Sequence, residues 1–176
     1  MVDAIVIVFL VYTFLSFYYL FFFTLIYFPN KKRMMDYPKI KRFYSISMVI
    51  PCYNEEKDIG GTIKHLLESD YKGLKEIIVV DDRSKDNSWK VIQEFAKKYK
   101  KVIAVQTPKN TGNAAGAKSY GAKLTTSELI GFSDADSYPE KDGFSKMIGF
   151  FNDDKVGAVS SSVLVKNRNN FLEKLQ

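Results

Sequence analysis

The stretch "KEIIVVDDRSKDNSWKVIQEFAKKYKKVIAVQTP", residues 75–108, decides the fold because two apolar runs flank a segment of helical periodicity. The Ile- and Val-rich runs at 75–84 and 101–108 predict strands, and residues 86–100 predict an amphipathic helix between them. A helix that connects two strands in this way is typical of a βαβ unit, whose strands are parallel. Residues 75–108 therefore predict one repeat of an α/β fold.

The same alternation continues on both sides of this unit. Further strands are expected at 44–56, 128–136 and 156–165, and further helices at 57–70, 113–124, 140–154 and 167–176. Strands that alternate with helices predict the α/β class, with a mostly parallel, Rossmann-like sheet and helices on both faces. The strands contain continuous Val/Ile runs, as expected when a strand is buried on both sides.

An uncharged segment of 25 residues, Ala4 to Phe28, precedes this domain. As a helix it would extend about 37 Å, more than the roughly 30 Å of a membrane's hydrocarbon core. It is too long for the apolar core of a cleaved signal peptide, and it follows an acid, Asp3. We therefore expect residues 1–30 to be a retained transmembrane helix.

Residues 31–43 form a basic juxtamembrane linker that carries +5 of the chain's net charge of +6. Positive charge at one end of a span predicts that this end is cytoplasmic. The chain is thus expected to be a single-pass protein of the cell membrane with its C-terminal domain, 44–176, in the cytoplasm. The linker is also suited to contact membrane lipid. Residues 43–176 carry only +2, which argues against a nucleic-acid partner.

Polar residues cluster where the predicted strands end. The first strand ends in Pro51, Cys52, Tyr53, Asn54, Glu55 and Glu56, the second in Asp81, Asp82, Arg83 and Ser84, and the fourth in Asp134, Ala135 and Asp136. Ligands of open α/β sheets bind outside the carboxyl ends of the strands, which parallel topology brings to one edge. The three clusters are therefore expected to converge on one ligand.

The acids one residue apart, Asp134 and Asp136, would repel each other without a positive partner. Mg²⁺ or Mn²⁺ prefers carboxylate and phosphate oxygens, so a divalent ion that bridges this pair to a nucleotide diphosphate fits the pattern. Two other phosphate motifs are set aside. No G-x-G-x-x-G follows the first strand, and "GNAAGAKS" at 112–119 has the wrong spacing for a Walker A loop.

Four motifs resemble a known family in order and spacing: "VIPCYNEE", "IIVVDDRSKDNS", "NTGNAAGAKSYGA" and "FSDADS". They are similar to the nucleotide-sugar-binding half of family 2 glycosyltransferases with the GT-A fold, over about residues 44–176. The preceding helix looks like the membrane-embedded branch that contains cellulose, chitin, hyaluronan and poly-N-acetylglucosamine synthases. The resemblance implies an inverting enzyme of the hexosyltransferase type. It would use a nucleotide-sugar donor, expected to be a UDP-sugar, and a glycan or lipid-linked acceptor in glycan or polysaccharide synthesis.

The resemblance also implies roles by position. The base and ribose would be contacted by Pro51, Tyr53, Glu55 and Asp82, with Asp81 as a helper. Gly112 and Lys118 would line the nucleotide pocket. Asp134 would contact the ribose or the metal, and Asp136 would bind the metal. Two positions depart from the family pattern. Arg83 stands where Gly is common, and Asn113 stands where Lys is common, which removes one positive charge near the expected diphosphate.

An inverting transfer needs a general base, which the resemblance implies lies far downstream of the D-x-D motif. The acids at 140–176 have the pattern of solvated surface charges, so the base is expected beyond Gln176. We thus expect a donor-binding half that is inactive alone and pairs with a C-terminal half or another membrane subunit. The alternative is a non-catalytic nucleotide-binding or regulatory module that docks onto a separate catalytic half. Sequence beyond Gln176 would distinguish the two.

Overall fold

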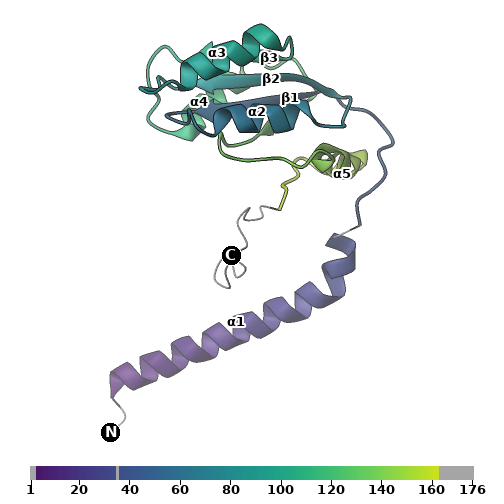
Figure 1. Cartoon of the computed structure of the whole chain (residues 1–176). Helices are drawn as coiled ribbons and strands as arrows, with labels where there is room; N and C mark the ends of the chain where they lie inside the picture. Colours follow the sequence, from purple (N-terminus) through teal and green to yellow (C-terminus); the bar gives the residue numbers. More distant parts are fainter. Residues whose placement is uncertain (1–2, 35, 163–176) are drawn as a thin grey trace. The chain divides into compact units, whose positions relative to one another are not determined.

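The structure is a computed structural model that describes residues 3–34 and 36–162. The chain divides into two compact units, Met1–Tyr37 and Pro38–Gln176. The first unit holds one long helix, α1, and the second holds a sheet with its covering helices (Figure 1).

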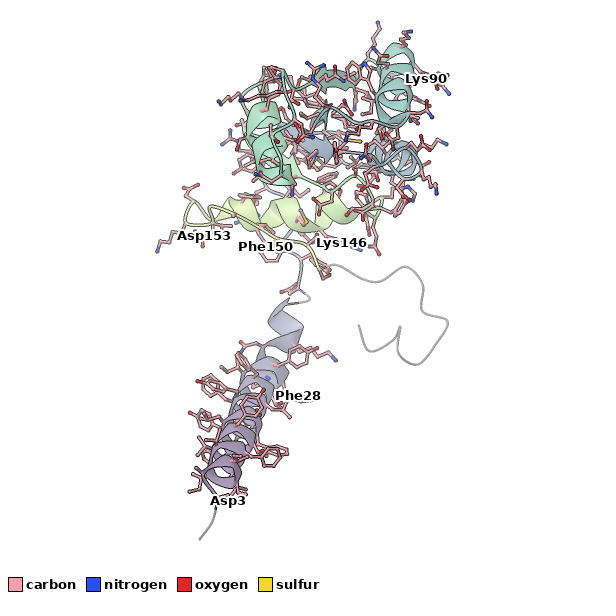
Figure 2. The ribbon with its side chains drawn as sticks, turned by 90° about the vertical axis from the view of Figure 1, so that its left-hand side faces the viewer. Asp3, Phe28, Lys90, Lys146, Phe150 and Asp153 are labelled. Atoms are coloured by element: carbon pink, nitrogen blue, oxygen red, sulfur yellow. The ribbon has the colours of Figure 1, made fainter. Side chains whose placement is uncertain are left out.

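Helix α1, Ala4–Met34, exposes apolar side chains around its whole circumference, and Figure 2 shows aromatic rings projecting between Asp3 and Phe28. The hydroxyls of Thr13, Ser16 and Thr24 donate to carbonyls four residues earlier, at 2.7–2.9 Å. These three hydroxyls are thus satisfied within the helix, as a membrane interior requires. Among the described residues, Ala4–Lys31 is the one helix long and apolar enough to span a membrane.

The helix extends past Pro29 to Met34, four residues beyond the expected span of 1–30. Lys31, Lys32 and Arg33 therefore fall in its last turn. The positive charge of Lys31 complements the negative end of the helix dipole.

The second unit is built on a four-stranded, fully parallel sheet with the order β3-β2-β1-β4. Its elements are β1 (Ile46–Cys52), α2 (Ile59–Leu67), β2 (Leu74–Asp81), α3 (Ser88–Lys98), β3 (Val102–Gln106), α4 (Ala114–Ala122), β4 (Leu129–Phe132), α5 (Gly143–Ile148) and the 3₁₀ turn η1 (Gly149–Asn152). The predicted parallel α/β fold is confirmed.

The two central strands, β1 and β2, are buried on both faces. On one face Ile50 and Val79 pack against Ile63 of α2 and Ile92 of α3. On the other face the core consists of Val49, Ile78, Val80 and Ala117 of α4. This arrangement explains the continuous Ile/Val runs in the sequence, since both faces of these strands pack against apolar cores.

Helix α4 lies close to the sheet because its inner positions are small. A Cβ atom added at Gly121 would lie 2.5 Å from Cγ1 of Val49 and 2.7 Å from Cγ2 of Val80. The alanine- and glycine-rich composition of 113–124 thus has a packing reason.

Residues 140–154, expected to form one helix, are split into α5 and η1. The N-terminal strap of this unit, Pro38–Tyr44, crosses the split. A Cβ at Gly149 would lie against the backbone carbonyl of Pro38, and the side chain of Asn152 bonds the strap at Lys39 O (2.9 Å) and Lys41 N (3.1 Å). Helix-disfavouring glycines and the close approach of this strap end the regular helix.

The prediction of a fifth strand at 156–165 is wrong for residues 156–162, which form no strand. Most of these residues are exposed, so they bury little of the apolar surface that would hold a strand against the sheet. The rest of that strand and the helix expected at 167–176 lie outside the described residues.

The loop between β3 and α4 is held to the end of β2 by the buried carboxylate of Asp82. The carboxylate accepts hydrogen bonds from the hydroxyl of Thr107 (2.8 Å), and from the hydroxyl (2.7 Å) and the N–H (2.9 and 3.0 Å) of Thr111. Asn110 donates to the backbone carbonyl of Asp82 at 2.7 Å. Burial alone would raise the pKa of Asp82, but the hydrogen bonds from Thr111 and Thr107 outweigh it and lower the pKa.

We predict that Gly121→Ala destabilises the sheet unit by about 1–3 kcal/mol, because the new methyl group overpacks α4 against Val49 and Val80. Urea unfolding of the detergent-solubilised chain, followed by the fluorescence of the half-buried Trp89, would measure this loss. The control is Gly143→Ala, where a Cβ meets no atom within 4 Å and the stability should not fall. Equal effects of both substitutions would contradict the packing argument.

We predict that Asp82→Asn costs about 1–3 kcal/mol at neutral pH, because an amide cannot accept all of the hydrogen bonds that the carboxylate accepts. The folded pKa of Asp82 lies below its unfolded value of about 3.9. Its stabilisation is therefore present above about pH 4 and is lost as the pH falls through the folded pKa. Unfolding free energy against pH should decline less steeply in the variant. Exposed Asp154→Asn is the control, and parallel curves for wild type and Asp82→Asn would refute the assignment.

Candidate functional site

A cavity of about 600 Å³ lies at the carboxyl ends of β1, β2 and β4. The chain runs from β1 through β2 to β3 on one side and then returns to place β4 on the other side of β1. The cavity thus lies at the point where the strand order reverses, which is where open α/β sheets bind ligands. Its lining comes from the ends of these strands, from the loop before α4 and from the first turns of α4: Pro51, Cys52, Tyr53, Glu55, Asp82, Asn110, Gly112, Asn113, Ala114, Ala117, Asp134, Ala135 and Asp136.

Seven of the nine residues singled out from the sequence line this cavity: Pro51, Tyr53, Glu55, Asp82, Gly112, Asp134 and Asp136. The other two, Asp81 and Lys118, are not among the lining residues that the structure describes. Three strand ends and the loop before α4 therefore meet at this cavity, and the parallel topology predicts the meeting of the strand ends.

Pro51 lies in a central strand because β4 is short. The carbonyl of Cys52 accepts a hydrogen bond from the N–H of Asp82, so Cys52 is bonded toward β2. The alternation of a parallel strand turns Pro51 the other way, toward β4, which has already ended at Phe132. A residue without an N–H is therefore tolerated there, and the cavity opens beside it.

Asp81 and Asp82 are both buried but point to opposite faces of the sheet. Asp82 shares the face of Ile78 and Val80, toward α4 and the cavity. Asp81 accepts a hydrogen bond from Nε2 of Gln106 at 2.8 Å and fastens β2 to β3 instead. Successive side chains of a strand point to opposite faces, so the sequence alone could have indicated that only one of these two acids faces the cavity.

Lys118 reaches the edge of the site through an ion pair. Its Nζ lies 2.9 Å from Oδ1 of Asp134. Side-chain exposures of 32% and 63% mean that water screens this pair, so it adds at most about 1 kcal/mol of stability. Among the ion pairs of the described residues, Asp136 takes part in none.

Burial and neighbouring negative charge make Glu55 harder to ionise. The pKa of Glu55 is raised first by burial and then by the negative charge of Asp136, with smaller contributions from Asp58 and Asp86. Oxygen donors of Glu55, Asp134 and Asp136 thus border one open cavity. This donor set suits a hard divalent cation such as Mg²⁺ or Mn²⁺, which would also relieve the repulsion.

Within residues 3–34 and 36–162, no group of three His, Cys, Asp or Glu side chains is arranged to hold a metal ion. A divalent ion at Asp134 and Asp136 would therefore share its remaining coordination with ligand oxygens, as Mg²⁺ often does with phosphates.

Cys52 lines the cavity as a packed, inert thiol. Its exposed fraction is 1%, and burial, with a smaller contribution from the charge of Asp81, raises the pKa of Cys52 to about 12. A hydrogen bond with Ser88 lowers the pKa by less. The thiol stays protonated at neutral pH and is no nucleophile.

Sequence reasoning missed how the residues of the loop between β3 and α4 are used. Asn113 caps α4, since its Oδ1 accepts the N–H of Gly116 at 2.8 Å. Asn110 bridges Asp82 to the N–H of Gly112, whose positive φ of 80° suits glycine. The run of Asn, Thr and Gly between a strand and a helix was the available signal for such a capped loop.

Arg83 departs from the family pattern but fits its position. It adopts the left-handed conformation, with φ of 64°, where glycine is the usual residue. Its guanidinium donates to the side chain of Gln106 (2.9 Å) and to the carbonyl of Pro108 (2.8 Å). These bonds to the start of the next loop compensate for the backbone conformation.

Two solved structures resemble this fold. A mannosyltransferase, PcManGT from Pyrobaculum calidifontis in complex with GDP-Man and Mn²⁺, has a TM-score of 0.64 at 23% identity and is matched over 76% of this chain and 41% of its own. Residues 1–349 of Staphylococcus aureus TarS in complex with UDP-GlcNAc have a TM-score of 0.56 at 23% identity, over 70% and 38% of the two chains. At this identity the likeness bears on the fold, and it agrees with the expected GT-A type.

Sequence comparisons show which family the chain belongs to. The probable glycosyltransferase YdaM of Bacillus subtilis is 35% identical over 141 residues, 78% of this chain and 32% of that protein. The poly-beta-1,6-N-acetyl-D-glucosamine synthase of Staphylococcus aureus is 31% identical over 148 residues, 84% and 34% of the two chains. The chain spans about a third of the length of these relatives. Because the family model described as "Glycosyl transferase family 2" matches residues 47–176, this chain belongs to glycosyl transferase family 2.

Proposed function

We propose that this chain is the donor-binding part of a membrane-anchored, inverting glycosyltransferase that takes a nucleotide-diphosphate sugar, with a UDP-sugar as the expected donor. The observation that carries the proposal is that Tyr53, Asp82, Asp134 and Asp136, from three strand ends, line one cavity at the switch point of the sheet. TarS, a similar fold, has been solved with UDP and with UDP-GlcNAc.

In this proposal Pro51, Tyr53, Glu55 and Asp82 hold the base and ribose. Tyr53 supports this role because its ring is 43% exposed at the cavity, where an aromatic face can stack on a base. Asp82 is a fixed acceptor, since its carboxylate is ionised and held by the loop at 107–111. Asp81 acts indirectly, through the end of β3.

The diphosphate lies, in this proposal, between the start of α4 and the acids that follow β4. Gly112, Asn113 and Ala114 line the cavity at the N-terminus of α4, the end of a helix that favours anions. Asp134 and Asp136 would hold Mg²⁺ or Mn²⁺, and Lys118 would exchange its pairing with Asp134 for the ligand. A bound metal would neutralise the diphosphate leaving group and so assist its departure.

Transfer with inversion needs a base that takes the proton of the acceptor hydroxyl. We place this base in sequence beyond Gln176. The described acids after the D-x-D motif support this: Glu140 and Asp142 pair with Lys146 at 3.1 and 2.9 Å, and none of Glu140, Asp142, Asp153 and Asp154 lines the cavity. A glycan or lipid-linked acceptor and the remaining catalytic half, in the same or another chain, belong to this proposal. The relative that makes poly-beta-1,6-N-acetyl-D-glucosamine supports a polymer product.

Membrane anchoring by α1, with the sheet unit in the cytoplasm, completes the proposal. The support is the apolar surface of Ala4–Lys31 and the positive charges at its C-terminal end. The same basic residues are suited to meet anionic lipid.

We predict that the chain binds UDP more tightly in the presence of Mn²⁺ and that Asp136→Asn weakens this metal-dependent binding at least tenfold, or about 1.4 kcal/mol. Without Mn²⁺ the variant and the wild type should bind UDP equally. Calorimetric titration of the detergent-solubilised chain measures both affinities. Asp154→Asn, an exposed acid away from the cavity, is the matched control. Equal metal-dependent affinity in Asp136→Asn would contradict the metal–diphosphate assignment.

We predict opposite membrane sides for the two ends of α1. In intact cells a membrane-impermeant maleimide should label Asp3→Cys but not Lys97→Cys on α3, and it should label both after permeabilisation. Native Cys52 gives little background, because it is 1% exposed and its pKa is raised to about 12. Labelling of Lys97→Cys in intact cells would reverse the proposed orientation.

A further inference from the structure

Helix α2 is hydrogen-bonded to the acidic loop, residues 134–136, which follows β4. No residue of α2 is among the cavity-lining residues that the structure describes. The fully buried hydroxyl of Thr62 donates to the backbone carbonyl of Ala135 at 2.6 Å. Ala135 is itself buried, while Asp134 and Asp136 on either side of it are exposed. The centre of the D-x-D motif is thus fixed to the helix, and its two carboxylates project from that fixed point.

A second contact lies just past Asp136. The hydroxyl of Tyr138 donates to Oδ1 of Asp58 at 2.8 Å, and its ring packs edge-on against His65, with 5.1 Å between centroids. Asp58 precedes the first residue of α2 but makes no capping bond with its side chain. An acid at that position would ordinarily cap the helix, but the carboxylate of Asp58 accepts a hydrogen bond from Tyr138 instead.

Gly61 makes room for this contact. A Cβ at Gly61 would lie 2.7 Å from Cε1 of Tyr138, closer than real side chains approach. Glycine inside a helix is less stable than alanine, so the close approach of the tyrosine ring gives a packing reason for glycine at this position.

We infer that Thr62 and Tyr138 are positioning residues of the metal–nucleotide site. They hold the backbone on both sides of Asp136, so that two carboxylates that repel each other stay aimed at one cation before it binds. The turn is closed by the N–H of Ser137, which donates to the carbonyl of Asp134 at 3.2 Å. Affinity gained in this way comes from pre-organisation, since neither Thr62 nor Tyr138 is among the cavity-lining residues that the structure describes. The inference rests on the proposed function.

The test measures Mn²⁺ affinity by electron paramagnetic resonance at saturating UDP, together with UDP affinity without metal. Thr62→Val keeps the shape and removes the hydroxyl, and it should weaken Mn²⁺ binding five- to fiftyfold while metal-free UDP binding stays within twofold. Thr62→Ser restores the hydroxyl and should restore the affinity. Tyr138→Phe should weaken Mn²⁺ binding three- to tenfold.

The matched control is Thr125→Val, because the hydroxyl of Thr125 also donates to a backbone carbonyl, that of Ala122 at 2.8 Å, but away from the acidic loop. It should leave both affinities unchanged. If Thr62→Val fails to fold, Tyr138→Phe decides the question at a partly exposed position. If the folded variants bind Mn²⁺ with wild-type affinity, the inference is overturned and the proposed function is not affected. Absence of Mn²⁺-dependent UDP binding in the wild type would overturn the proposed function, and the inference with it.

Discussion

Parallel pairing of β1 with β2 on one side and with β4 on the other is the constraint on which the site depends. The register matches Cys52 with Asp81 and Val49 with Phe132, so the polar residues that follow each strand emerge at the same edge. Residues separated by about 80 positions in sequence thereby line one cavity. The burial of β1 and β2 on both faces holds this register, because a shift of one residue would move every side chain to the wrong face.

The acids of the site divide into two kinds. Asp81 and Asp82 are buried and hydrogen-bonded to the chain, and they set the geometry of β3 and of the loop that follows it. Asp134 and Asp136 are exposed, and one lysine balances only one of them. Buried carboxylates with several donors stabilise the fold, whereas exposed carboxylates that repel each other leave binding energy for a cation. The same edge of the sheet thus carries two buried acids that fix the fold, of which Asp82 also lines the cavity, and two exposed acids beside them.

The fold class followed from the sequence because period and strand composition are local properties, and the described residues contain the first four of the five expected strands. The convergence of Tyr53, Asp82 and Asp136 was predictable for the same reason, since parallel topology alone brings strand ends together. What failed depended on tertiary contacts. The end of α5 is decided by Pro38, more than a hundred residues away, and the strand expected at 156–165 lacks burial over its described part. The contacts of Thr62 and Asn110 could not be foreseen, because hydroxyl and amide partners have no periodic signature.

The pairing of β1 with β4 also has a consequence for the order of folding. Strands β1, β2 and β3 are consecutive and can pair as soon as they have been synthesised, because each needs only one short crossover. β4 must instead return to β1, where Leu129 pairs with Ile46, and such a contact carries a large loop-closure cost. The acids after β4 consequently reach the cavity last. A ribosome-bound chain would already hold the ends of β1 and β2 in place while Asp134 and Asp136 were still being made.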